Sequence, residues 1–123
     1  MNEIRTYFGN TIKRIIELKN GNFNPADRIL FVVRDIQKNP VWWAVLPIIE
    51  EQGKYTVTIE IPHTEAIQCF KRDRSYRWGM TWYRNAVLDD TGFPIDGLVR
   101  VLVDSAAWIV CDAEARKDGI NNG

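Results

Sequence analysis

Hydrophobic and polar residues alternate most regularly over residues 55–61, which predicts a β-strand. One set of side chains is apolar and is expected to face the core, and the other set is polar and is expected to face water. The apolar set is Tyr55, Val57, Ile59 and Ile61, and the polar set is Thr56, Thr58 and Glu60. Gln52-Gly53 precedes this stretch and predicts a turn that makes a hairpin with the strand before it.

A second alternating stretch covers residues 76–83 and also predicts a strand. Its apolar face consists of Tyr76, Trp78, Met80 and Trp82, and its opposite face consists of Arg77, Gly79, Thr81 and Tyr83. The aromatic face is expected to belong to the core. Gly79 leaves a gap in the row of side chains on the other face, where a ligand or another backbone could approach.

Three further stretches are rich in β-branched and aromatic residues and predict strands over residues 28–36, 41–46 and 98–103. Asn39-Pro40 marks a turn between the first two, so these are expected to pair. Trp42 and Trp43 are adjacent on the second strand and must point to opposite faces. One of the two is therefore covered by another element or offered to a partner.

Residues 10–19 predict an N-terminal helix, because Ile12, Ile15 and Ile16 fall near helical spacing, with Asn10 as a cap and Gly21 just past the end. The competing interpretation is a two-residue turn at Gly9-Asn10 between strands over 4–8 and 11–16. Alternation in the second arm is poor, which favours the helix.

The chain from Ser105 onward contains good helix formers, places Arg116 and Lys117 near a helix C-terminus and offers Gly119 beyond the end. It predicts a C-terminal helix, with a strand over 108–111 as the alternative. Residues 65–70 are ambiguous between a helical turn and a short strand.

Together these elements predict an α+β fold: an antiparallel sheet of about five strands with an N-terminal and a C-terminal helix packed on one face. The length of 123 residues and the 46% hydrophobic content indicate one globular domain over residues 1–123. The last residues, 120–123, are expected to fray.

Sixteen acidic residues balance sixteen basic ones, so the chain lacks the overall positive field of non-specific nucleic-acid and membrane-surface binders. The N-terminus does not resemble a signal peptide, and the longest apolar run, residues 41–49, is too short to span a bilayer. We expect a cytoplasmic protein without a membrane partner.

Groups suited to catalysis are few. His63 is the only histidine, and Cys69 and Cys111 lack metal-ligand or redox spacing, so no metal and no cofactor are predicted. The carboxylate pairs Glu50-Glu51 and Asp89-Asp90 are typical of solvated turns. An enzyme that uses His63 with an acidic residue is the least favoured hypothesis.

Residues 70–84 combine five aromatic and five basic residues, a density typical of a binding surface. Arginine offers a planar fork for carboxylate or phosphate, and tyrosine and tryptophan dominate interface energies. The alternative is an exposed strand whose charges only keep the chain soluble. The candidate binding residues are Trp42, Trp43, Lys71, Arg72, Arg74, Arg77, Tyr83 and Arg84.

These features predict a non-catalytic binding protein. By analogy of type alone, the leading hypothesis is an inhibitor or immunity-type protein that caps a toxin or enzyme. Arg77, Tyr83 and one of the two tryptophans would anchor an acidic or mixed protein surface. The alternative is a nucleotide or single-stranded nucleic-acid binder that uses the arginines on phosphates and Tyr83 on a base. The sequence also allows the chain to form a homo-oligomer.

Overall fold

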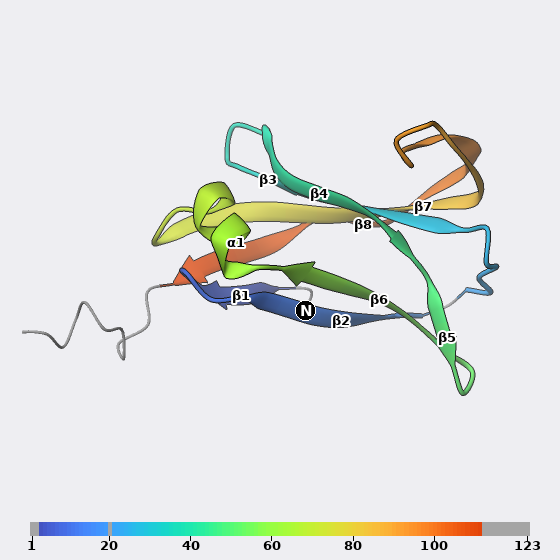
Figure 1. Cartoon of the computed structure of the whole chain (residues 1–123), viewed down its shortest axis with the longest axis horizontal. Helices are drawn as coiled ribbons and strands as arrows, with labels where there is room; N and C mark the ends of the chain where they lie inside the picture. Colours follow the sequence, from blue (N-terminus) through green and yellow to red (C-terminus); the bar gives the residue numbers. More distant parts are fainter. Residues whose placement is uncertain (1–2, 20, 112–123) are drawn as a thin grey trace, which may run out of the picture.

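The computed structural model describes residues 3–19 and 21–111, which form eight strands and one short helix (Figure 1). In chain order these elements are β1 (Ile4–Tyr7), β2 (Ile12–Leu18), β3 (Arg28–Arg34), β4 (Pro40–Pro47), β5 (Ile49–Glu51), β6 (Lys54–Ile61), α1 (His63–Cys69), β7 (Arg74–Leu88) and β8 (Pro94–Cys111). The fold is therefore mostly β.

The strands form two sheets. Sheet A has five strands in the order β1-β8-β7-β3-β4, and sheet B has three strands in the order β2-β6-β5. Sheet A is mixed, because β1 runs parallel to β8 while its other neighbouring strands are antiparallel. The chain passes from β4 directly into β5, so this edge joins the two sheets, and together they curve into a half-barrel (Figure 1).

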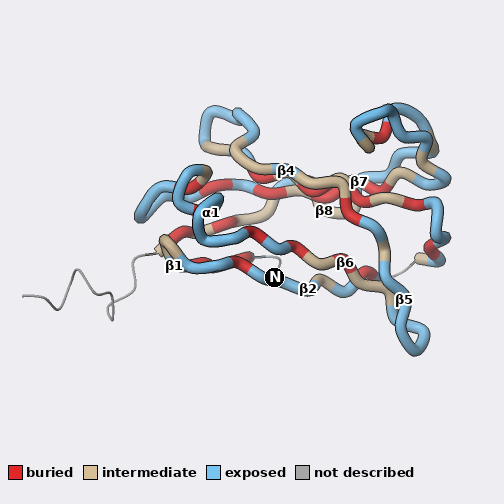
Figure 2. Tube along the Cα trace, in the orientation of Figure 1, coloured by how far each residue is buried: buried red, intermediate tan, exposed pale blue. Residues whose placement is uncertain are grey.

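The core lies between the sheets. Buried residues alternate with less buried ones along β3, β6 and β7, as the period-2 geometry of a strand requires (Figure 2). The predicted core face of residues 76–83 is confirmed, since its four large side chains are all buried. Val57, Ile59 and Ile61 are likewise fully buried, which confirms the face predicted for β6.

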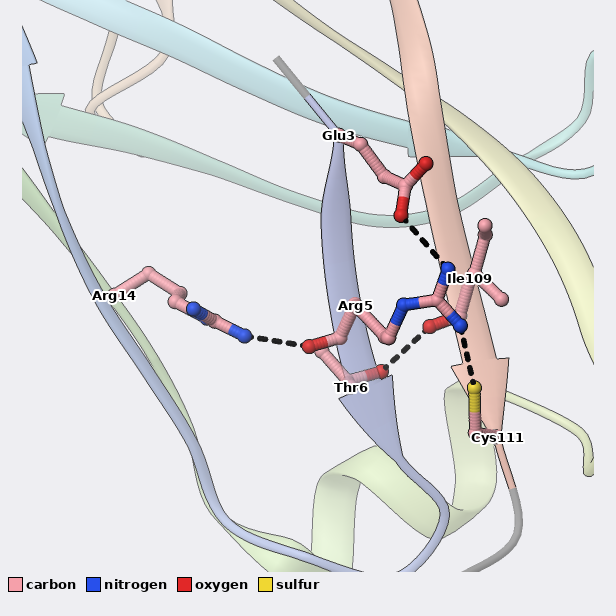
Figure 3. Close-up of polar contacts among 6 residues, drawn as sticks. All are labelled: Glu3, Arg5, Thr6, Arg14, Ile109 and Cys111. Carbon is pink, nitrogen blue, oxygen red and sulfur yellow. Dashed lines mark hydrogen bonds and ion pairs between the residues drawn. The ribbon is translucent and has the colours of Figure 1, made fainter. Parts of the chain in front are cut away.

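Side-chain hydrogen bonds also connect β1 with β8 in sheet A and with β2 in sheet B (Figure 3). The Thr6 hydroxyl of β1 donates a hydrogen bond to the Ile109 carbonyl of β8, and Arg14 of β2 donates to the Arg5 carbonyl of β1. The Arg5 guanidinium contacts the Cys111 sulfur at 3.5 Å and Glu3 at 3.0 Å. The hydrogen bond to Cys111, followed by the one to Glu3, raises the pKa of Arg5.

The predicted N-terminal helix is wrong: residues 12–18 form strand β2, which pairs with β6 along its whole length. Ile12 and Leu18 are buried and Ile16 is partly buried, whereas Ile15 is 67% exposed. The core-facing positions thus follow a period of two, with Arg14 in an otherwise apolar row. A turn does follow β1, but its central residues are Phe8 and Gly9, since the Asn10 N–H donates to the Tyr7 carbonyl, and β1 and β2 join different sheets and do not pair.

The predicted C-terminal helix is also wrong over the part that the structure describes. Residues 105–111 continue β8 and pair with β7 on one side and β1 on the other. Trp108 and Val110 are buried at alternate positions, which a strand provides and a helix does not. The remainder of that predicted helix and the tail lie outside the described residues.

The segment that the pattern left ambiguous forms α1, which lies at one end of the half-barrel (Figure 1). Its Ala66 is buried, and Phe70 beyond its end stacks on Trp108 with ring centroids 5.2 Å apart. The predicted α+β fold is replaced by a half-barrel, because residues 12–18 and the described residues 105–111 are strands that complete the two sheets.

Candidate functional site

The face of sheet A that points away from sheet B is the most distinctive surface of the molecule, and we call it the outer face. On β3, Leu30 and Val32 point to this side, while Ile29, Phe31 and Val33 point to the core. The other aliphatic members of the outer face come from β4 and β8: Val45, Val99 and Val101. These aliphatic residues lie on β3, β4 and β8, and β7, which runs between β3 and β8, adds Arg77, Gly79, Thr81 and Tyr83 to the same face.

Two turns enclose the outer face. Figure 1 shows the β3–β4 turn and the tip of the β7–β8 hairpin both rising from sheet A on the side away from β2 and β6. The two turns border the outer face at its two ends, and we call the outer face together with these two turns, its walls, the trough. Because loops positioned by a rigid scaffold commonly carry binding residues, this shape makes the trough the candidate site.

The first wall is fixed by Asp35. One carboxylate oxygen of Asp35 accepts hydrogen bonds from the backbone N–H groups of Gln37 and Asn39, both at 2.9 Å. Lys38 adopts a positive φ of 70°, and its carbonyl accepts a hydrogen bond from Arg34. Ile36 stands on this wall with 79% of its surface exposed.

The second wall is fixed by Asp89 in the hairpin tip. Its carboxylate accepts hydrogen bonds from the Thr91 hydroxyl at 2.6 Å and from the N–H groups of Thr91 and Phe93 at 2.8 and 3.0 Å. The bond from the Thr91 hydroxyl, followed by the one from Phe93, lowers the pKa of Asp89. Phe93 then meets Trp43 edge to face, with ring centroids 5.5 Å apart.

The bend that raises this tip depends on a buried carboxylate. Asp27, 1% exposed, accepts hydrogen bonds from the Asn85 N–H, the Trp82 indole N–H and the Asn24 N–H at 2.9–3.0 Å. Asn85 has a φ of 50° and Gly97 opposite it has a φ of 133°, so the ladder is interrupted there on both strands. Asp27 thereby holds the base of the tip against the core.

A hollow of about 530 Å³ lies at the end of the trough beside the first wall. Its floor is lined by Leu30, Val32, Thr81 and Val101, and its rim carries three cationic side chains, Arg34, Lys38 and Arg77. Asp35 and Asp104 are the acidic residues of the lining. The hollow thus combines an aliphatic floor with a partly cationic rim.

Gly79 lines this hollow, and the backbone of β8 approaches it closely. The sequence had left open whether a ligand or another backbone approaches this glycine. A Cβ atom at this position would be 2.9 Å from the carbonyl oxygens of both Val103 and Asp104. The β7–β8 pairing shifts register on both sides of Met80, which brings those carbonyls toward the glycine.

The structure divides the predicted binding residues between two sides of sheet A. Trp43, Arg77 and Tyr83 share the outer face, and Trp43 is 52% exposed. Trp42 points to the inner side, where it contacts Phe31 and donates a hydrogen bond to Glu65. Trp43 is therefore the tryptophan available to a partner.

The remaining predicted residues do not line the hollow beside the first wall. Lys71 and Arg74 line a second hollow near the start of β7, which shares Asp35 and Ile36 with the first, and the Arg72 guanidinium lies 4.7 Å from the centre of the Phe8 ring. Arg84 lies over the Trp82 ring at 5.2 Å. These four cations do not join Arg77 in a single cluster.

Sequence reasoning missed the aliphatic floor and Arg34. A signal was present: residues 29–33 are apolar at every position, and residues 98–103 are apolar except for Arg100. Such runs are typical of strands covered on both faces, in contrast to the clean alternation of β6. Since only one face of sheet A meets the core, these runs mark the outer face as a surface with a further use.

The described residues include no group of three or more histidine, cysteine or acidic side chains that could hold a metal ion. His63 is exposed at the first position of α1. The Ser105 hydroxyl accepts a hydrogen bond from Arg77. Burial, followed by the charge of Glu65, raises the pKa of the Cys69 thiol. A raised pKa keeps a thiol protonated and weakly nucleophilic.

Within residues 3–19 and 21–111, no helix is long and apolar enough to cross a membrane. Comparison with known proteins finds no family model that matches the chain and no curated protein that matches its sequence. The site is therefore interpreted from its own geometry.

Proposed function

We propose that this chain is a non-catalytic binding protein of the inhibitor or immunity type, which caps a toxin or enzyme with the outer face of sheet A. The observation that carries the proposal is the trough, whose aliphatic floor is exposed between two walls that are each fixed by an internally bonded aspartate. Exposed apolar residues that are rimmed by polar ones commonly mark an interaction site on a small protein.

The composition of the outer face supports a protein partner. Trp43, Tyr83 and Arg77 belong to the three residue types that most often dominate interface energies, and they surround an aliphatic centre. Trp43 is held by Phe93, so a partner gains contact area without ordering a free side chain. Lys71, Arg72 and Arg74 lie outside the trough and contribute long-range attraction to an acidic partner.

A single nucleotide fits this geometry less well. Arg77 and Tyr83 are six residues apart on β7, a separation of about 20 Å along a strand. Arg84, which the nucleotide hypothesis also requires, lies over Trp82 and not beside Arg77. A protein surface can span this distance, whereas one nucleotide cannot place its phosphate and base on both ends.

We place this interaction in the cytoplasm. Cys69 and Cys111 are both free thiols, as is usual in a reducing compartment.

The test is co-expression with the product of the adjacent gene, because an inhibitor is usually encoded beside its target. A stoichiometric complex and loss of the target's activity are expected. Val101→Asp places a charge on the floor and should weaken the complex at least about 30-fold, as expected for an interface centre.

Ile15→Asp is the matched control, since Ile15 is an exposed aliphatic strand residue on sheet B (67% exposed, against 58% for Val101). It should bind like the unmodified chain. Equal loss in both variants, or a neighbouring gene product that is neither bound nor inhibited, would contradict the proposal.

A further inference from the structure

Two arginines lie directly opposite each other at one end of the trough. Arg34 of β3 and Arg77 of β7 are register partners, and both line the same hollow. Like charges directly opposite each other on neighbouring strands repel and destabilise the pair. Neither guanidinium forms an ion pair with a carboxylate in the part of the chain that the structure describes.

Both guanidiniums are held in place by neutral groups. Arg77 donates from Nε to the Ser105 hydroxyl at 2.9 Å and from Nη2 to the Ser105 carbonyl at 2.8 Å. Arg34 donates from Nη1 to the Lys38 carbonyl at 3.1 Å. These bonds restrict the orientation of both forks and use only part of their five N–H donors each, so donors remain for an anion.

The acidic residues of the hollow do not neutralise the pair. Asp35 has one carboxylate oxygen occupied by two backbone N–H groups of its own turn. Asp104 is exposed and forms no ion pair with any other described residue. Three cations against two carboxylates leave a net positive charge around the hollow.

We propose that the Arg34–Arg77 pair binds a carboxylate of the partner, carried by an extended segment whose apolar side chains lie on the floor formed by Leu30, Val32 and Val101. This inference rests on the proposed function and specifies the chemistry of the partner. Two guanidinium forks bind a carboxylate through charge-assisted hydrogen bonds, which are stronger than neutral ones.

The lining of the hollow favours a carboxylate over the phosphate of a nucleic acid. Its apolar side chains are aliphatic, and no aromatic ring lines it. Single-stranded nucleic acids gain much of their affinity from bases stacked on aromatic rings, which this hollow does not offer beside its cations. An aliphatic floor with a carboxylate-binding end matches an extended peptide whose apolar and acidic side chains are two residues apart and therefore lie on one face.

The experiment is an NMR titration with the capped hexapeptide Val-Ser-Val-Ser-Glu-Ser, in which both valines and the glutamate lie on one face of the extended chain. Shifts are expected in the Nε–H signals of Arg34 and Arg77 and in the methyl signals of Leu30, Val32 and Val101. A peptide with lysine in place of glutamate should shift none of them. If the glutamate peptide leaves these signals unchanged, the proposal is overturned.

Arg77→Gln should weaken the peptide about tenfold, in line with the loss of a charge-assisted bond. Lys13→Gln is the control, because Lys13 is an exposed cation on β2 of sheet B and has no place in the trough, and it should leave the affinity unchanged. Arg34→Gln and Arg77→Gln should unfold at the same temperature as the unmodified chain or a higher one, since each relieves repulsion between like charges.

A single-stranded oligonucleotide and inorganic phosphate are titrated in parallel. The carboxylate assignment would be overturned if the signals of the two arginines shift with the oligonucleotide or with phosphate but not with the glutamate peptide. In the complex with the adjacent gene product, Arg34→Gln and Arg77→Gln should also weaken binding. If these two variants bind the gene product normally while Val101→Asp does not, this inference fails and the proposed function stands. If the peptide binds but no complex with the adjacent gene product forms, the proposed function fails and the carboxylate site stands.

Discussion

The two faces of strand β7 have opposite surroundings although their residues alternate in one sequence. The inner face carries Tyr76, Trp78, Met80 and Trp82, which are all buried in the core. The outer face carries Arg77, Gly79, Thr81 and Tyr83, which lie beside the aliphatic residues of β3 and β8. The inner face needs its apolar residues for folding, whereas the outer face keeps apolar neighbours that folding alone does not require.

This difference separates stability from recognition within one sheet. Substitutions on the inner face are expected to change the free energy of unfolding, and substitutions on the outer face are expected to change binding. The predictions below test this separation, beginning with the largest expected effect.

Phe31→Ala removes a fully buried ring that stacks on Trp78 at 5.1 Å and contacts the rings of Trp42 and Trp108. It should lower the free energy of unfolding by about 3–5 kcal/mol, because it loses burial and leaves a cavity. Val32 is the neighbour of Phe31 in the sequence and points to the outer face, so Val32→Ala should lower the free energy of unfolding by only about 1 kcal/mol. Urea denaturation measures both. An equal loss would indicate that the outer face is covered in solution, as in a homo-oligomer.

Asp27→Asn leaves the shape of the side chain but removes the charge that accepts three N–H donors in a buried site. We expect a loss of about 2–3 kcal/mol in the free energy of unfolding, since hydrogen bonds to buried charged groups are among the stronger ones. Asp90→Asn, an exposed aspartate in the hairpin tip, serves as the control and should be neutral. A neutral Asp27→Asn would show that Asp27 does not hold the base of the tip.

Gly79→Ala introduces a methyl group that would lie 2.9 Å from two backbone carbonyl oxygens of β8. The strands must move apart, so we expect a loss of about 1–3 kcal/mol, typical of overpacking. Thr81→Ala on the same face should cost less than about 1 kcal/mol. The melting temperatures of the two variants measure this difference, and an unaffected Gly79→Ala would mean that the register shift in β8 relaxes easily.

The smallest effect concerns pH and is confined to the hairpin tip. The pKa of Asp89 is lowered from its ordinary value of 3.8, so its carboxylate stabilises the tip above that pH, and this contribution is lost as the pH falls through the lowered pKa. Amide exchange at Thr91 and Phe93 should therefore accelerate below about pH 4 relative to the rest of sheet A. Asp89→Asn should lack this pH dependence, and an identical dependence in that variant would assign it to another group.

The strand predictions succeeded where one face alone meets the core. Residues 55–61 and 76–83 alternate cleanly, and both are strands with the predicted core faces. The pairing of β3 with β4 and the opposite orientations of Trp42 and Trp43 also follow from local rules. Trp43, Arg77 and Tyr83 of the trough were proposed as binding residues from their types, and the aliphatic floor was not; their role in binding stays a prediction.

The helix predictions failed because local propensity and long-range pairing compete. Residues 105–111 contain alanines that favour a helix, yet they lie between β7 and β1 in the sheet, and neither pairing can be read from adjacent residues. Residues 12–18 carry Arg14 in the row that faces the core side, which breaks the alternation that would have indicated a strand. In both segments the hydrogen bonds to distant strands outweigh the local preference.

The sequence by itself determined the period-2 strands, their core faces and the types of residue available for binding, because these depend on side chains a few positions apart. Only the tertiary structure decided that Arg34 lies opposite Arg77, that Phe93 holds Trp43 and that two turns enclose an aliphatic floor. Each of these arrangements joins segments that are far apart in the chain. Their proximity is set by strand register and by the bend at Asn85 and Gly97, which no local pattern of residues encodes.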